Sequence, residues 1–443
     1  MNDFQIKIVN RMMKNKVFAV ICFLFMSTVV LGQQNTLTND GAWCWFSAPG
    51  AIYKHNGKAE VVTGWVTSDG SIEAATLNLE AKTSYIQTVS PKLDRDDHAN
   101  PSFIELNNKD VLMFYTKHFD QAVRMNKLSA AGDSKDFGAT SFKEVFSEEQ
   151  FKLYPRKCVT YANPIALKKE KNRLFCFGRW TGFKPNMMWS DDNGETFNPA
   201  QVFITNQPFN DDNRPYVRYY SDGKSKIHII FTDGHPRKEP TNSVYYACYE
   251  KGAFWRADGT KICDLNQIPF EPKEATVVYQ ATKETGRAWV YDVTADKKGN
   301  PVILYARYPK ETEHLYHYAQ YIKGEWIDNE ICNSGKWFPQ TPEGKTEREP
   351  HYSAGLTFHP LKPNTIYLSR NVNGVFEIEK RVTSDFGKTW EVTPITQHSK
   401  YDNVRPIVPK NMKKGDKTVV LWMENEKYIH YTNFKSRIKY FLD

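Results

Sequence analysis

The sequence has few of the features that helical, zinc-binding or nucleic-acid-binding proteins carry. Helical periodicity is nearly absent, and apolar residues occur instead in short β-branched and aromatic runs. No block rich in lysine and arginine occurs, which counts against nucleic acid as a partner. The seven cysteines form no CxxC pair, and GxSxG, a phosphate-binding glycine loop and a zinc-binding helix motif are missing. These absences leave an all-β chain without a common hydrolase or nucleotide-binding signature.

The long apolar run at the N-terminus has the pattern of a secretory signal peptide. A basic segment, KIVNRMMKNK, precedes VFAVICFLFMSTVVLG, which ends at Gly32. We therefore expect residues 1–32 to be a cleaved signal peptide and residues 33–443 to be a single soluble domain, secreted or periplasmic. No later segment is apolar enough to span a bilayer, so no membrane contact is expected. Without the signal's net +3, the formal charge falls from +8 to +5, which is compatible with a polyanionic ligand.

Six cysteines remain after the signal peptide, and an even number in an exported protein permits disulfides. Cys176 in RLFCFG and Cys248 in VYYACYE lie inside apolar, strand-like runs. At these two positions the sequence favours plain buried thiols.

One module recurs along the chain: a polar or aromatic start, an apolar strand, a polar turn, and a second strand with a polar end. Seven copies begin near residues 42, 96, 161, 212, 287, 351 and 402, a spacing typical of propeller blades. SDDNGETF (190–197) and TSDFGKTW (383–390) match the Asp-box turn, in which Asp192 and Asp385 would bind turn amides. The sequence therefore predicts an all-β, seven-bladed β-propeller, in which each module supplies the two innermost strands of a blade.

The ends of the modules should gather at one face of this propeller. In an antiparallel hairpin, the start of the first strand lies beside the end of the second. The turns, such as NNKD and ADKKGN, are ordinary solvated turns, whereas the other ends collect His, Tyr and Arg. The predicted site residues are His98, His118, Tyr161, Arg179, Arg214, Tyr216, His235, Tyr352 and Arg370. A concave surface with several titratable groups is a good candidate for a binding or active site.

These residue types suit β-elimination from a uronic acid. Arginine would neutralise the carboxylate and stabilise the enolate-like charge that develops. A histidine or tyrosine would remove the proton beside the carboxylate, and another group would protonate the leaving sugar oxygen. This route requires no cofactor. Paired carboxylates are poorly represented at the module ends, which counts against a two-carboxylate glycosidase.

The segments GAWCWF, DDHANP, YANP, FTDGHP and YSAGL, with the Asp boxes, resemble BNR-repeat propellers that include the ulvan lyases of polysaccharide lyase families 24 and 25. The resemblance implies a secreted lyase that cleaves rhamnose–uronic acid bonds in ulvan, an anionic, sulfated algal polysaccharide. It implies His98 and Tyr161 as the acid/base pair and Arg179 as the carboxylate neutraliser. His118, Tyr216 and His235 would position the substrate, and we add Arg214, Tyr352 and Arg370 as substrate-binding residues. The resemblance leaves open which of the pair is the base.

The resemblance also carries expectations about other ligands and alternatives. Some lyases of this type hold a structural divalent cation, so the resemblance allows a calcium or zinc ion here, although the sequence does not identify its ligands. We expect the protein to be a monomer. Relatives carry an acidic and a basic residue where this chain has Ala48 and Gly50. Two alternatives therefore stay open. One is an α-L-rhamnosidase-type hydrolase on the same propeller, with His55 as its candidate histidine, and the other is a non-catalytic carbohydrate-binding propeller. Gly50 and the lack of an early Arg-Ile-Pro motif argue against a sialidase.

Overall fold

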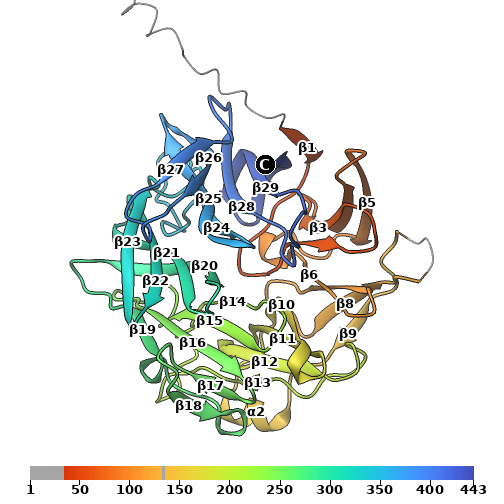
Figure 1. Ribbon diagram of the computed structural model, residues 1–443, viewed down its shortest axis with the longest axis vertical. Coiled ribbons are helices and arrows are strands. Elements are labelled where there is room, and N and C mark those ends of the chain that lie inside the picture. The colour runs from red at the N-terminus through yellow and green to blue at the C-terminus, as the bar shows by residue number, and fades with distance from the viewer. Residues whose placement is uncertain (1–33, 132–134) are drawn as a thin grey trace, which may run out of the picture. The chain divides into compact units, whose positions relative to one another are not determined.

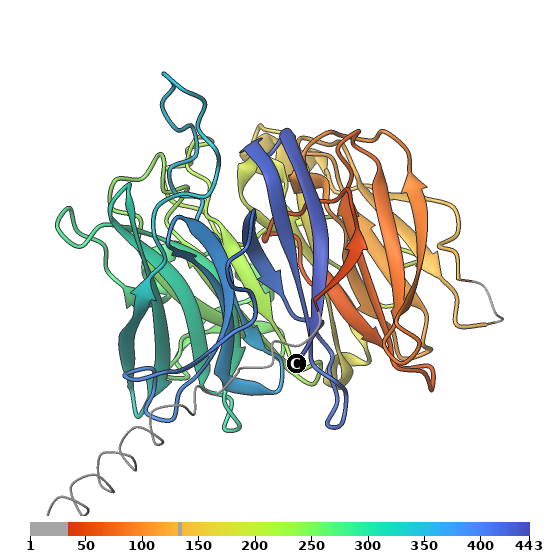
Figure 2. The ribbon, with the colours of Figure 1, turned by 90° about the horizontal axis from the view of Figure 1, so that it is seen from above.

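The computed structural model describes residues 34–131 and 135–443, and the predicted signal peptide lies outside them. Within these residues the chain forms seven antiparallel sheets around a central axis (Figure 1). Figure 2 shows the same blades from the side, with their strands running between the two faces of the ring. The predicted seven-bladed β-propeller is confirmed. No helix among the described residues is long and apolar enough to cross a membrane.

Each predicted module supplies the two innermost strands of one blade, as expected from its hairpin pattern. In order of blades one to seven, these pairs are β2 (Ala51–Lys54) and β3 (Glu60–Val66); β6 (Ser102–Glu105) and β7 (Val111–Tyr115); β10 (Thr160–Leu167) and β11 (Arg173–Arg179); β14 (Val217–Tyr220) and β15 (Lys226–Thr232); β20 (Arg287–Ala295) and β21 (Pro301–Lys310); β24 (Leu356–His359) and β25 (Lys362–Val372); and β28 (Asp402–Ile407) and β29 (Val419–His430).

The remaining strands form the outer parts of the blades, and short helices lie in the connections. The outer strands are β4 (Ile72–Asn78), β5 (Thr83–Ser90), β8 (Val123–Leu128), β9 (Ser141–Lys143), β12 (Pro185–Ser190), β13 (Gln201–Val202), β16 (Val244–Glu250), β17 (Ala253–Trp255), β18 (Lys261–Asp264), β19 (Thr276–Tyr279), β22 (Glu313–Ile322), β23 (Glu325–Asn333), β26 (Val375–Val382), β27 (Glu391–Pro394), β30 (Asn433–Leu442) and β1 (Asn35–Thr38). The helices are α2 (Glu148–Leu153) and the 3-10 turns η1 (Asp97–Ala99), η2 (Lys168–Glu170), η3 (Thr181–Phe183), η4 (Leu265–Gln267) and η5 (Pro272–Glu274).

The ring is closed by strands from the two ends of the described chain. Strand β1 pairs antiparallel with β30, so the last blade combines the first strand with the last three. This pairing covers the outer edge of β30 and holds the first and last blades together.

Both Asp boxes form the predicted turns. In the first, the Asp192 carboxylate accepts hydrogen bonds from the Ser190 hydroxyl at 2.7 Å and the Thr196 amide at 2.9 Å. Gly194 follows with φ of 89°, a backbone angle that glycine adopts without strain. The Thr196 hydroxyl and amide hydrogen bonds lower the pKa of Asp192 to about 2. Asp385 makes the same contacts in the second box, with Thr383 and Thr389. Both aspartates are therefore structural.

The start of the first module is not a strand but a segment, residues 43–50, that fills one part of the channel. The indole of Trp45 donates to the Val290 carbonyl at 3.2 Å and stacks on Tyr291 at 5.2 Å. The Arg405 guanidinium lies 5.2 Å from the Trp45 ring centre. One segment from blade one thus contacts blades five and seven, which fixes their inner strands around a common aromatic core.

The six cysteines of the described residues are all free thiols. Cys176 and Cys248 are buried, as the apolar runs around them predicted. Burial raises the pKa of Cys176 to about 12, so this thiol stays protonated and behaves as a small apolar side chain.

Candidate active site

The two histidines at the ends of the innermost hairpin of blade two lie against each other. His98 lies in η1 before β6, and His118 follows β7. Their rings are parallel, with centres 4.1 Å apart and an interplanar angle of 5°. The Nδ1 atoms contact opposite oxygens of the Asp96 carboxylate, at 2.6 Å for His98 and 2.8 Å for His118. The hairpin thus brings its two ends together, and one carboxylate orients both imidazoles.

The shared carboxylate gives the two histidines different charge states. Burial opposes a charge on His98, but Asp96 and its hydrogen bond raise the pKa of His98 well above the usual value. Burial, together with the positive charge on His98, lowers the pKa of His118 to about 3. Burial also opposes the charge on Asp96, yet His98 and the two hydrogen bonds hold the pKa of that carboxyl well below its usual value. At neutral pH the cluster is an imidazolium, a neutral imidazole and a carboxylate.

Tyr161 and Arg179 come from the neighbouring inner hairpin, in blade three. Tyr161 follows a register irregularity at the start of β10 and has φ of 67°, a backbone region that non-glycine residues rarely occupy. Its ring centre lies 5.8 Å from His98. Its hydroxyl is buried and makes no well-formed hydrogen bond to any described residue. Burial and the neighbouring Tyr216 raise the pKa of Tyr161 well above 10, so the free protein holds a neutral phenol here.

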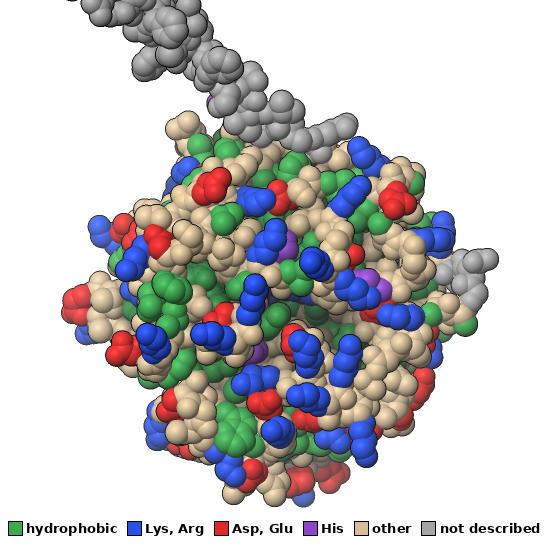
Figure 3. All heavy atoms as spheres, viewed as in Figure 1, with side chains coloured by type: hydrophobic (Ala, Val, Ile, Leu, Met, Phe, Trp, Pro, Cys, Tyr) green, Lys and Arg blue, Asp and Glu red, His purple; other side chains and the backbone are tan. Residues whose placement is uncertain are grey.

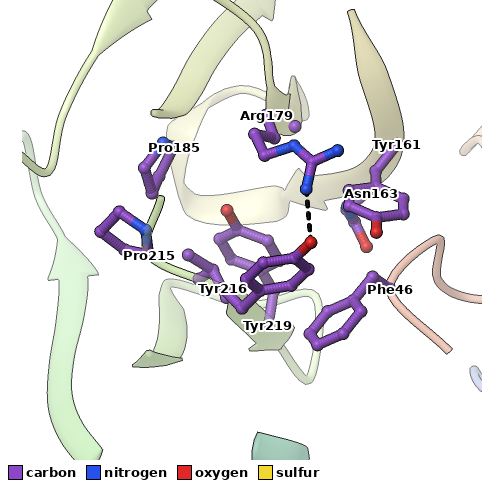
Figure 4. A pocket seen from close by; sticks show the side chains of 10 residues that line it. Phe46, Tyr161, Asn163, Arg179, Pro185, Pro215, Tyr216 and Tyr219 are labelled. Atoms are coloured by element: carbon purple, nitrogen blue, oxygen red, sulfur yellow. Dashed lines mark hydrogen bonds between the residues drawn. The ribbon is translucent and has the colours of Figure 1, made fainter. Parts of the chain in front are cut away.

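The Arg179 guanidinium joins the tyrosines to the histidine pair. It donates from Nη1 to the Tyr216 hydroxyl at 2.5 Å (Figure 4), and Nη2 lies 3.3 Å from His118 Nε2. Its carbon Cζ lies 5.1 Å from the centre of the Tyr161 ring. Among the described residues Arg179 forms no ion pair with a carboxylate, and its Nε is buried without a hydrogen-bond partner. Tyr161, Arg179 and Tyr216 line a small cavity together with Phe46 (Figure 4).

Three further predicted residues border this cluster at different distances. His235, after β15, packs 5.2 Å from Tyr216, and burial followed by the charge of Arg214 lowers its pKa well below the usual value. The guanidinium of Arg214 lies 5.2 Å from the ring of Phe183. Tyr352 contacts Trp289 at 5.9 Å, and that tryptophan in turn contacts Tyr216. Tyr352 therefore reaches the cluster only through other aromatic rings.

Arg370 lies apart from the others. Strand β25 continues to Val372, so Arg370 is inside the strand and not at its end. Its Nε donates to Glu379 on β26 at 2.8 Å. Its predicted role in substrate binding has no support from its position.

Sequence reasoning missed three residues that complete the site. Asp96 and Asp97 precede His98 directly, and the DDH triplet was the available signal. Asp97 is fully buried and pairs with Arg405 Nη1 at 2.5 Å, which anchors η1 to blade seven. Tyr431 packs edge-on against His98 at 4.7 Å. Tyr431 lies in the turn between β29 and β30, outside the innermost hairpin. The sequence prediction considered only the ends of the innermost hairpins and therefore did not include it.

Side chains of the His98 cluster are candidate ligands for the predicted structural cation. Asp96, His98 and His118, and also Cys44, Asp97 and His98, have potential ligand atoms within 4.8 Å of one another. However, the His98 Nδ1 and Asp96 oxygen lie 2.6 Å apart, in direct hydrogen-bond contact. Two ligands of a tetrahedral zinc at about 2 Å lie more than about 3 Å from each other. The Asp96–His98 contact therefore fits hydrogen bonding and not metal ligation, and the ligands of a cation stay unidentified.

The alternative histidine, His55, lies in the turn between β2 and β3. Its Nδ1 is 3.2 Å from Glu105 and its Nε2 is 3.4 Å from Asp416. Both ring nitrogens are thus occupied by carboxylates from blades two and seven. This position fits a brace between neighbouring turns.

Ala48 and Gly50 line a second small cavity, together with Trp43 and Trp45. Arg218 and Lys410 also line it, and both lie near the buried carboxylate of Asp292, at 3.8 and 3.1 Å. On the face drawn in Figure 3, lysine and arginine side chains surround the hollow at the centre of the ring. This distribution agrees with the positive net charge of the chain.

The chain belongs to the BNR repeat-containing family, whose model matches residues 62–334. This match covers more than half of the sequence and agrees with the Asp-box turns and the closed ring of blades. No curated protein sequence matches the chain.

Solved structures of the same fold include polysaccharide lyases and a lectin. An ulvan lyase of polysaccharide lyase family 25, bound to -[GlcA(1-4)Rha3S]-, is 14% identical, with a TM-score of 0.67 over 92% of this chain and 95% of that one. The polysaccharide lyase Uly1 is 12% identical, with a TM-score of 0.58 over 93% and 98%. The BP39L lectin of Burkholderia pseudomallei is 9% identical, with a TM-score of 0.54 over 90% and 97%. At these identities the likeness establishes the fold.

Proposed function

We propose that this protein is an exported polysaccharide lyase that cleaves rhamnose–uronic acid bonds of ulvan, or of a similar sulfated polymer, by β-elimination. The observation that carries the proposal is the arrangement of His98, Tyr161 and Arg179 at one mouth of the channel. The ring of Tyr161 lies 5.8 Å from the imidazolium of His98 and 5.1 Å from the guanidinium of Arg179, which pairs with no carboxylate among the described residues. The likeness to two polysaccharide lyases supports the same class of reaction.

In this mechanism Arg179 binds the uronate carboxylate. It has no carboxylate partner among the described residues, so a substrate carboxylate would complete its charge pairing. The same contact stabilises the negative charge that spreads onto the carboxylate when the neighbouring C–H bond breaks. His118, whose Nε2 lies 3.3 Å from Arg179, positions the guanidinium.

His98 and Tyr161 then divide the two proton transfers. His98 enters the reaction charged, because Asp96 raises its pKa, and is therefore the proton donor to the leaving sugar oxygen. Tyr161 first loses its phenolic proton to solvent, and the phenolate then removes the proton beside the carboxylate. The positive charge of Arg179 favours this phenolate. The C–H bond and the neighbouring C–O bond break, a carbon–carbon double bond forms, and the leaving oxygen takes the His98 proton. All groups in this scheme belong to the chain.

The test is incubation of the purified protein with ulvan while the ultraviolet absorbance of the unsaturated product is recorded. We expect a rising absorbance that His98→Ala abolishes. The matched control is His228→Gln, which changes a buried histidine of β15, near the turn end of the inner hairpin of blade four, bonded to Tyr246 at 2.8 Å. New reducing ends without absorbance would indicate a hydrolase and refute the lyase.

A carbohydrate-binding propeller without turnover is the second candidate, because a lectin shares the fold at a TM-score of 0.54. Retention of the protein on ulvan with no product at any pH would favour it. The same measurement as above separates the two candidates.

A further inference from the structure

A row of stacked aromatic rings runs from the proposed proton donor to the protein surface. His98 stacks on His118, and the His118 ring stacks on Phe119 with centres 4.4 Å apart. Phe119 in turn lies nearly parallel to Phe183, at 5.9 Å and 16°. Phe119 is 56% exposed, whereas His98 and Phe183 are buried. Phe119, the exposed ring in this row, therefore lies directly beside the candidate active site.

The backbone at both phenylalanines is unusual. Phe119 has φ of 114° and Phe183 has φ of 62°, a range in which bulky side chains are rarely found. Phe119 gains little from core burial because more than half of its surface is in solvent. Strained residues that the core does not require concentrate at ligand-binding positions. The strain here holds an aromatic ring at the rim of the site.

Three guanidinium groups surround the Phe183 ring. Their Cζ atoms lie 4.1 Å (Arg156), 4.4 Å (Arg179) and 5.2 Å (Arg214) from its centre. The Nε atoms of Arg179 and Arg214 are buried without hydrogen-bond partners.

Only one of these arginines is paired. Within the described residues, Arg179 and Arg214 form no ion pair, and Arg156 pairs with Asp211 at 3.2 Å. The Asp211 side chain is 54% exposed, and exposed ion pairs of this kind are weak. The arginine cluster therefore holds more positive charge than one carboxylate compensates, which favours binding of anionic groups.

We propose that Phe119, Phe183, Arg156 and Arg214 form a second subsite that binds the anionic sugar residue next to the cleavage position. The sugar ring packs against Phe119, and its sulfate or carboxylate group contacts Arg156 and Arg214. Arg179 remains available for the uronate that is cleaved. The inference rests on the proposed function. It predicts that the affinity for the polysaccharide increases when the sugar chain extends beyond the two residues that flank the broken bond.

Native electrophoresis through gels containing ulvan tests this subsite, because retardation measures binding without turnover. We expect Phe119→Ala to weaken retardation about tenfold, as loss of one aromatic stacking partner does, and Phe119→Trp to keep it. The matched control is Phe142→Ala. Phe142 is also a surface phenylalanine, 63% exposed and 5.2 Å from Arg124, but it lies on the outer strand β9. This control should leave retardation unchanged.

A second arm identifies the anionic group. Arg156→Gln removes an exposed side chain and should fold normally. Gels with desulfated ulvan or carboxyl-reduced ulvan then show which polymer loses its sensitivity to Arg156→Gln, and uncharged dextran serves as the blank. The modified polymer that binds wild type and variant equally lacks the group that Arg156 contacts.

The outcomes separate this inference from the proposed function. Equal retardation of wild type, Phe119→Ala and Phe142→Ala in ulvan overturns the subsite, even if the wild type releases unsaturated product. Retardation that depends on Phe119 without any unsaturated product supports the subsite and refutes the lyase. A wild type that no anionic polymer retards overturns the subsite as well.

Discussion

Replacing Tyr161 with phenylalanine should inactivate the protein without weakening its fold. The substitution removes one hydroxyl and keeps the ring, which packs against Phe46 at 5.7 Å and under Arg179 at 5.1 Å. The hydroxyl is buried and makes no well-formed hydrogen bond to a described residue. The nearby Tyr216 hydroxyl is already bonded to Arg179. The free protein therefore gains little from the Tyr161 oxygen, because its contact with the Tyr216 hydroxyl is not a well-formed hydrogen bond.

The magnitudes follow from this contact pattern. A buried polar group without a partner costs about 1–3 kcal/mol, so its removal should leave the free energy of unfolding unchanged or raise it by about 1 kcal/mol. Loss of a proton-transfer group lowers kcat by about 100- to 10,000-fold. Stability and activity should thus change in opposite directions.

Denaturant unfolding measures the first quantity and the absorbance assay measures the second. The matched control is Tyr308→Phe, because the Tyr308 hydroxyl donates to the His351 carbonyl at 2.9 Å. This variant should lose about 1 kcal/mol of stability and keep its kcat. The reasoning is refuted if Tyr161→Phe unfolds more easily than the wild type, or if it retains wild-type kcat.

Four further predictions concern the charges and the thiols. Asp96→Asn removes the anion that keeps His98 protonated, so kcat should fall by about 100-fold or more. The control is Asp94→Asn, which affects only the bond that the Asp94 carboxylate accepts from the His118 amide at 2.9 Å, and it should change kcat little. Equal losses of kcat in both variants would contradict the role of Asp96. The pKa values of His98 and Tyr161 are both raised, so kcat/KM should rise with pH through neutrality and fall only when His98 loses its proton, and an optimum in acid would argue against these roles. The stability from the His98–Asp96 pair should be present at neutral pH, and should be lost as pH rises through the raised pKa of His98 or falls through the lowered pKa of Asp96. All six cysteines of the described residues are free, so a thiol reductant should leave Tm unchanged; a drop in Tm would reveal a disulfide.

Most of the fold could be predicted because its signals are local. Seven hairpins with polar turns and two Asp boxes depend on residues a few positions apart, and each of the seven modules became the inner pair of a blade. Residues 43–50 were the exception. Their aromatic residues look like the start of a strand, but contacts with Val290 and Arg405, far away in the sequence, place them in the channel.

The site was predictable only as a set of residues. Hairpin geometry places His98 beside His118, and Tyr161 near Arg179, because antiparallel strands bring their ends together. It failed for Arg370, since β25 is longer than the module pattern suggests, and it missed Tyr431, which lies in an outer turn. The extent of each strand depends on its neighbours in the sheet, which a single sequence does not reveal.

Composition and periodicity by themselves determined that this chain is all-β, that it repeats seven times, and that its His, Tyr and Arg side chains collect at one end of the repeats. These properties depend on short-range steric and hydrogen-bonding preferences. Only the tertiary structure decided that Asp96 contacts both imidazoles, that His98 is charged and His118 neutral, and that Arg179 faces no carboxylate. Charge states depend on burial and on distances of a few ångströms between side chains, and these are set only when the hairpin of blade two folds and packs against its neighbours.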